Sequence, residues 1–289
     1  METTGRLRGG APATRRDLGL SRLPYWALIL AALGLFLTYL IFSTTNYRET
    51  FHFLRAGVTT TIRMTLIAFP IATIIGLVVG LSRISKNVIL FNLATLYVET
   101  VRGIPLIVLI LYTAFVVVPL GRDLAVLVGE WGLARVGQGF LYGFFYYLAN
   151  FSIQSIGMES RAIAALSIGY GAFEAEIFRA GIQSIGKGQG EAARSLGMSY
   201  MQSMRYVILP QAIRRVLPPL GNDFIALLKD SSLATVLAVP ELTQMGRLRR
   251  SSTFRYLETF NVVAYLYLAM TLMLSGLVRG IEKRFKYEE

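Results

Sequence analysis

The fold class that this sequence predicts is an all-α integral membrane protein. Hydrophobic residues make up 54% of the 289 residues and charged residues only 16%, whereas charged residues are about 25% of an average soluble chain. Several nearly uncharged runs approach or exceed the roughly 18 to 20 apolar residues that cross a bilayer as a helix. The chain has no cysteine, so disulfides and thiolate metal sites are excluded.

The basic excess, 29 Lys and Arg against 17 Asp and Glu, suits either nucleic-acid binding or the cytoplasmic loops of a membrane protein. The apolar runs favour the second interpretation, so no nucleic-acid partner is expected. His52 is the single histidine and lies between Phe51 and Phe53, which indicates a membrane-interface residue rather than a ligand. No cofactor or metal site is expected.

Six membrane spans are predicted. The first covers residues 23–47, which carry no charge, and follows a cytoplasmic tail at residues 1–22. A cleaved signal peptide is the alternative, but the apolar core is long and no clear cleavage site follows it. The remaining spans are expected near residues 58–82, 90–118, 162–185, 220–239 and 260–278. Both termini are then cytoplasmic.

Residues 121–159 are expected to be external. Their second half, residues 136–158, has no charge and could be mistaken for a further span. Counting it as a span would place the basic residues after position 186 on the external side of the membrane, against the positive-inside rule. An interfacial helix around residues 140–148 is predicted instead. Four arginines do not follow the positive-inside rule, because this topology places them outside: Arg247, Arg249, Arg250 and Arg255.

Residues 186–210 favour helix formation but are not apolar enough to span a membrane. Glu191 is expected in the first turn of a short helix, where the helix dipole favours a carboxylate. Ala192, Ala193 and Leu196 would form a small apolar face. Gly197 is placed to end the helix in the left-handed conformation.

A second short helix is predicted directly afterwards. Ser199 and Gln202 have the spacing of a capping box, and Pro210 is expected to end the helix. Basic residues, Arg194 among them, flank the first helix. Docking to another protein is favoured over adsorption to lipid headgroups, which would require a larger apolar face than two alanines and a leucine.

These residues carry a family resemblance. Residues 189–197 read Gln-Gly-Glu-Ala-Ala-Arg-Ser-Leu-Gly and resemble the "EAA" loop of permease subunits in binding-protein-dependent ATP-binding-cassette (ABC) importers. Further sequence motifs of the polar amino-acid branch of that family are resembled by residues 99–105, 209–212 and 228–233. The resemblance covers roughly residues 57–286, with its motifs in the family's order.

The resemblance implies the transmembrane domain of a type I ABC importer. Its five-helix core would occupy residues 48–286, with residues 23–47 as an extra N-terminal transmembrane helix. The implied partners are a cytoplasmic ABC ATPase subunit dimer, a second permease subunit, an extracytoplasmic solute-binding protein and a polar amino acid. The residues implied to couple to the ATPase are Glu191, Ala192, Ala193, Arg194, Leu196 and Gly197.

Nucleotide binding by this chain is not expected. Residues 181–188 nearly match a phosphate-binding loop, but Gly188 stands where the magnesium-binding hydroxyl is required. The stretch also ends a predicted helix instead of opening one. The chain is therefore not expected to be an enzyme, and ATP hydrolysis is assigned to the partner.

Ionisable residues inside spans are costly and usually face a cavity. Glu174 is hypothesised to line the substrate path and to contact the amino group of an amino acid. Glu176 is a further candidate for the substrate path. It lies three residues before Arg179 on one helix face, so the alternative is that the two simply pair with each other. Because a helix turns about 100° per residue, Glu174 and Glu176 cannot share one environment.

Three further residues are candidates for the substrate path. Asn222 and Asp223 follow Pro218 and Pro219, a predicted break that would free backbone groups beside protein or water. Arg102 would suit a carboxylate. The identity of the amino acid stays open, as does a permease homodimer against a heterodimer. The rival function is an ATP-independent secondary transporter or channel, which predicts matching inverted halves that the sequence does not show.

Overall fold

The computed structural model describes residues 25–136 and 138–285. The predicted tail at residues 1–22 and the first two residues of the predicted N-terminal span lie outside the described residues. Within these two ranges the chain is helical and contains no strand.

The first half of the chain comprises α1 (Tyr25–Ser43), α2 (Thr45–Ser82), α3 (Val88–Gly103), α4 (Leu106–Tyr112), α5 (Val118–Leu133) and α6 (Phe140–Ala149). The second half comprises α7 (Met158–Gln183), α8 (Lys187–Ser195), α9 (Tyr200–Ser203), α10 (Leu209–Asp230), α11 (Leu242–Thr253) and α12 (Tyr256–Phe285). Two π-helical turns, Thr113–Val117 and Met204–Ile208, join α4 to α5 and α9 to α10.

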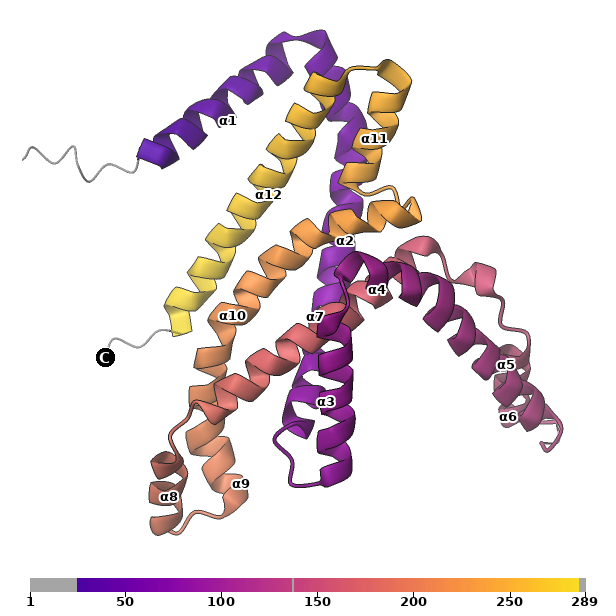
Figure 1. Cartoon of the computed structure of the whole chain (residues 1–289), viewed down its shortest axis with the longest axis vertical. Helices are drawn as coiled ribbons and strands as arrows, with labels where there is room; N and C mark the ends of the chain where they lie inside the picture. The colour runs from indigo at the N-terminus through magenta and orange to yellow at the C-terminus, as the bar shows by residue number, and fades with distance from the viewer. Residues whose placement is uncertain (1–24, 137, 286–289) are drawn as a thin grey trace, which may run out of the picture.

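Among the described residues, four helices are long and apolar enough to cross a membrane: Tyr25–Ser43, Thr45–Ser82, Leu106–Leu133 and Tyr256–Arg284. The predicted spans at α7 and α10 fall below that hydropathy because both helices carry ionisable residues. In Figure 1, α2 runs through the middle of the molecule, with α8 and α9 at one end and α11 at the other.

The core forms where α2 and α7 pack side by side. Glycines permit the contact, because a Cβ added at Gly76 would lie 2.7 Å from the Cβ of Glu174, and one at Gly80 would lie 2.7 Å from the Ala175 carbonyl oxygen. Such close backbone approach is typical of small-residue interfaces between membrane helices. Buried apolar side chains extend this core to α10: Met64, Ala68, Ala72, Leu166 and Leu227.

The helix after the EAA-like loop is longer than the sequence predicted. Pro210 does not end it, because residues 200–230 run continuously through α9, the π turn and α10. Pro210 lies directly after the π turn, and such a local π adjustment lets a helix continue past a proline that lacks an N–H. Pro218 and Pro219 are also accommodated inside α10, so the predicted break before Asn222 is wrong.

The predicted span at residues 90–118 is divided by Pro105, with α3 ending at Gly103 and α4 starting at Leu106. From there the helix continues to Leu133, beyond the predicted end of the span. α5 and α6 then pair as a hairpin inside the segment expected to be external. The placement of that segment relative to the membrane stays a prediction.

Two of the four exceptional arginines bind the N-terminal turns of α2. Arg249 forms an ion pair with Glu49 at 3.0 Å, and Arg255 donates to the side chain of Asn46. The N-terminal turns of α2 therefore supply acceptors to this basic segment. This local pairing explains why the arginines depart from the charge pattern of the other loops.

Candidate functional site

The loop at residues 186–210 lies at the end of the molecule opposite α11 (Figure 1). Its first helix, α8, starts after Gly186 and has no acidic residue in its first turn. Glu191 is in the second turn, so its predicted position was one turn too early. The side chain of Glu191 is exposed.

Gly197 ends α8 as predicted. Its φ is +80°, and nothing lies within 4 Å of the position where a Cβ would be. The Gly197 N–H donates to the Arg194 carbonyl at 2.9 Å, and the Met198 N–H donates to the Ala193 carbonyl at 3.1 Å. These two bonds form a Schellman motif, which satisfies carbonyls that the helix end would otherwise leave unpaired.

The predicted capping box is present at the start of α9. The Gln202 N–H donates to Ser199 Oγ at 3.3 Å, and the Ser199 N–H donates to Gln202 Oε1 at 2.9 Å. Gly197 and this cap therefore fix both sides of the turn between α8 and α9. The turn has a defined conformation built entirely from local sequence.

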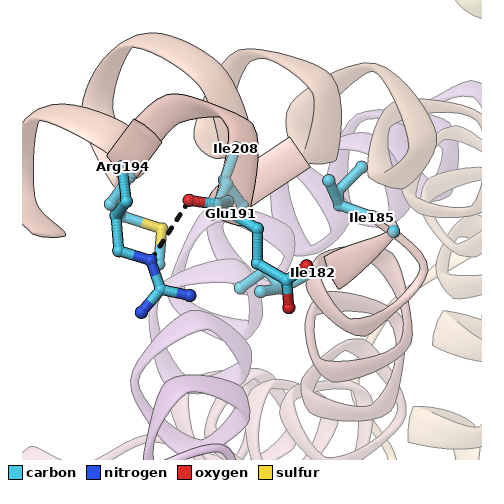
Figure 2. Close-up of a pocket in the computed structure, with 8 residues that line it drawn as sticks. Ile182, Ile185, Glu191, Arg194 and Ile208 are labelled. Atoms are coloured by element: carbon cyan, nitrogen blue, oxygen red, sulfur yellow. Dashed lines mark hydrogen bonds between the residues drawn. The ribbon is translucent and has the colours of Figure 1, made fainter. Parts of the chain in front are cut away.

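A groove of about 270 Å³ separates α8 from the end of α7 and the π turn before α10. Its apolar wall includes Ile182, Ile185 and Ile208, and Glu191 and Arg194 supply its polar side. Figure 2 shows the Glu191 side chain pointing toward Ile182, and Arg194 Nε donating to the Gly190 carbonyl at 3.2 Å. The loop thus presents charged groups at the rim of an apolar depression.

The predicted apolar face of α8 is divided. Ala193 is buried, whereas Ala192 and Leu196 are exposed, so the three do not form one surface. The exposed apolar surface instead continues from Leu196 onto α9. Leu196, Tyr200 and Met201 are 80%, 71% and 70% exposed. We call these three residues the loop knob. The last two were not predicted as part of this surface; the capping box indicated only where α9 begins.

Glu174 is fully buried in the middle of α7. Neither carboxylate oxygen has a hydrogen-bond partner among the described residues. Thr73 of α2 lies beside it, but the Thr73 hydroxyl donates to the Phe69 carbonyl at 2.9 Å. A buried carboxylate without a donor is costly, which marks Glu174 as a site for an additional cation or proton.

Asp223 of α10 is close enough to Glu174 to interact with it electrostatically. Its Oδ2 is also buried without a partner among the residues described. Asp230, near the end of the same helix, accepts a hydrogen bond from the Tyr170 hydroxyl at 2.8 Å. Asn222 is exposed on another side of α10. The structure thus brings Glu174 and Asp223 together and leaves Asn222 apart.

Glu176 lies in a different environment, as the helical spacing predicted. Arg179 Nε donates to Glu176 Oε2 at 3.0 Å, which is the expected pair. Arg83 at the end of α2 adds a contact of 2.8 Å to Glu176 and one of 3.3 Å to Glu99. Arg102 is exposed, with its guanidinium 5.6 Å from the ring centre of Phe173. These charges tie α2, α3 and α7 together.

A family described as the binding-protein-dependent transport system inner membrane component matches residues 72–287. The chain belongs to this family of transport permeases. The match includes α7, the EAA-like loop, α10 and α12, and it agrees with a multi-pass protein of the inner membrane. Membership in the family also favours an ABC importer subunit over an ATP-independent secondary transporter.

Individual relatives match most of the permease. It is 34% identical over 251 residues to the probable amino-acid ABC transporter permease protein YckA of Bacillus subtilis strain 168, covering 86% of this chain and 95% of that protein. It is 34% identical over 230 residues to the glutamine transport system permease protein GlnP of Escherichia coli strain K12, covering 80% of this chain and 91% of that protein.

Solved structures share the fold. One, titled as the crystal structure of an amino acid ABC transporter with histidines, has a TM-score of 0.65 and 34% identity, covering 84% of this chain and 98% of that chain. The inward-facing MetNI methionine ABC transporter has a TM-score of 0.59 at 23% identity, covering 81% of this chain and 96% of that chain, and supports the fold alone.

The Gly197→Ala variant of the permease should loosen α8, because an alanine in the left-handed region costs about 1 kcal/mol. Amide hydrogen exchange over Lys187–Ser195 should accelerate by about fivefold if the helix opens locally. Gly188→Ala is the control, because Gly188 lies inside α8 with open space at its Cβ position, where alanine favours the helix more than glycine does. Equal exchange in both variants would contradict the structural role of Gly197.

Proposed function

We propose that this permease forms the membrane path of an ABC importer for a polar amino acid. An extracytoplasmic binding protein delivers the solute, and a separate ATPase subunit dimer hydrolyses ATP. The names of the relatives support an amino acid as the substrate, since one is an amino-acid permease and another a glutamine permease. The observation that carries the proposal is the rigid, exposed loop knob within the family match.

The loop knob is the contact for the ATPase subunit. Leu196, Tyr200 and Met201 are large apolar side chains that are mostly exposed in this chain, and such anchors dominate interfaces when they enter a pocket. Glu191 and Arg194 provide polar groups at the neighbouring groove. Docking there places the loop, and with it both chain termini, on the cytoplasmic side.

The continuous helix of residues 200–230 transmits the motion of the loop into the membrane. When the ATPase displaces the loop knob, α10 moves and carries Asp223 with it. Asp223 interacts electrostatically with Glu174 on α7. A second permease subunit, either another copy or a similar chain, completes the enclosure of the path. Exposed polar residues such as Asn222 and Arg102 then face that path.

Glu174 and Asp223 bind the amino group of the substrate when the path opens. Both carry buried carboxylate oxygens that lack donors among the described residues, and an ammonium group supplies three donors. Arg102 is the candidate for the substrate carboxylate, because a guanidinium can bind it in a bidentate way. Glu176 is engaged by Arg83 and Arg179 and holds the surrounding helices together.

The Leu196→Asp variant should weaken docking of the ATPase, because it places a charge in an apolar contact. The loss of one such anchor is worth about 2 kcal/mol. ATP-dependent uptake in proteoliposomes and the amount of ATPase subunit co-purified with the permease should both fall by more than about tenfold.

Leu257→Asp is the control for that substitution. Leu257 is 70% exposed and lies at the opposite end of the molecule, near the start of α12. This variant should retain the ATPase subunit. If the two variants bound the ATPase equally well, the loop knob would not be the docking site.

The Glu174→Gln variant should reduce the apparent affinity for the transported amino acid, because a charge-assisted hydrogen bond to an ammonium is worth about 1.5 to 3 kcal/mol. Concentration-dependent uptake should show the loss, whereas co-purification of the ATPase subunit should not change. Glu130→Gln, at an exposed residue on α5, is the control. Unchanged affinity and rate in Glu174→Gln would remove this residue from the substrate path.

A further inference from the structure

The hairpin of α5 and α6 takes no part in the proposed coupling and is built as a rigid unit. A Cβ at Gly129 would lie 2.2 Å from the Ala149 backbone nitrogen, and one at Gly132 would lie 2.1 Å from the Phe145 ring. Only glycine permits helices this close. At the open end, Arg122 Nε donates to the Phe151 carbonyl at 2.9 Å and links the two helices of the hairpin.

Three faces can be distinguished on α5. At about 100° per residue, Gly129 and Gly132 face α6, a charged face lies about 140° to one side of them, and an apolar face lies about 140° to the other side. The charged face holds Asp123 and Glu130, whereas Arg122 lies on the side of α5 that faces α6, in agreement with its bond to Phe151. The apolar face consists of residues that are each more than half exposed: Leu120, Leu124, Leu127 and Trp131. α5 is therefore amphipathic, with its apolar face uncovered in this chain.

The outward face of α6 is aromatic. Phe140, Phe144 and Tyr147 follow one another at the helical spacing and are 94%, 53% and 64% exposed. Residues 136–158 contain no charge. Near the turn, the Arg135 guanidinium lies 4.2 Å from the Trp131 ring centre. Aromatic rings beside a basic residue are typical of the boundary between lipid headgroups and acyl chains.

The position of the hairpin points to lipid as the occupant of these faces. α5 continues without interruption from α4, and the combined helix Leu106–Leu133 is itself apolar enough to cross a membrane. In Figure 1 the hairpin spreads away from the other helices and runs back toward the level of α3, not beyond the end marked by α11. The exposed apolar residues of α5 therefore continue along the same helix as the exposed Ile107, Val108 and Leu111 of α4.

We propose that the α5–α6 hairpin is a membrane-anchoring element whose apolar faces contact the lipid bilayer. The stripes of Trp131 and Phe144 contact acyl chains, and the charged face of α5 contacts headgroups and water. This inference concerns how the permease is anchored in the membrane, and it does not depend on which solute is transported. Its failure would leave the proposed coupling through α8 untouched.

Tryptophan fluorescence tests the proposal, because Trp26 and Trp131 are the two tryptophans of the chain. The full-length Trp26→Phe permease is reconstituted in phosphatidylcholine vesicles with bromine at defined acyl positions. Trp131 emission should shift to shorter wavelength and lose most of its intensity to lipids brominated near the headgroup end. Aqueous iodide should quench it weakly. The reciprocal Trp131→Phe chain reports on Trp26 in the apolar helix α1 as a lipid-exposed control.

Two results would overturn the proposal. Strong iodide quenching without bromolipid quenching would place the hairpin in water, and protection from both quenchers would mean that protein covers it. Thiol labelling gives an independent measurement, since the chain has no cysteine of its own. A charged maleimide should react more slowly with Phe144→Cys than with Ser251→Cys on α11, and equal rates would contradict lipid contact.

Discussion

One unbroken helical path, residues 200–230, connects the loop at the end of the molecule to its core. This path begins at the loop knob and ends beside the core of α2 and α7. Three prolines lie along this helix without ending it. The π turn precedes Pro210, and Pro218 and Pro219 lie inside α10. A rod of this kind carries displacement directly, whereas a break near Pro210 would have separated the loop from Asp223.

The second attachment of the loop is α7, which is held firmly in the core. Gly76 and Gly80 bring α2 against the backbone of α7 at Glu174 and Ala175, and Arg83 binds Glu176 below that contact. Interfaces packed this closely rearrange between discrete states more readily than they deform continuously. In the proposed function, movement of α10 relative to α7 exposes the carboxylates of Glu174 and Asp223.

Features that depend on neighbouring residues in the chain could be predicted from the sequence, whereas features that depend on tertiary packing could not. The αL glycine at Gly197, the Ser199–Gln202 capping box and the Glu176–Arg179 pair depend on neighbours a few residues away, and all three are present. The expected helix end at Pro210 was wrong because its outcome depends on the preceding turn. The split of the alanines in the loop follows from packing of α8 on the π turn, which no local pattern encodes.

The most direct test measures whether residues 200–230 move as one body. The absence of cysteine allows spin labels at Met201→Cys with Lys229→Cys, and at Met201→Cys with Val88→Cys, in the complete transporter. Pulsed dipolar spectroscopy with and without bound ATP should give an unchanged, narrow distance for the first pair and a changed distance for the second. A shift or broadening within the first pair on ATP binding would show that the helix bends at the π turn, and it would contradict rigid transmission.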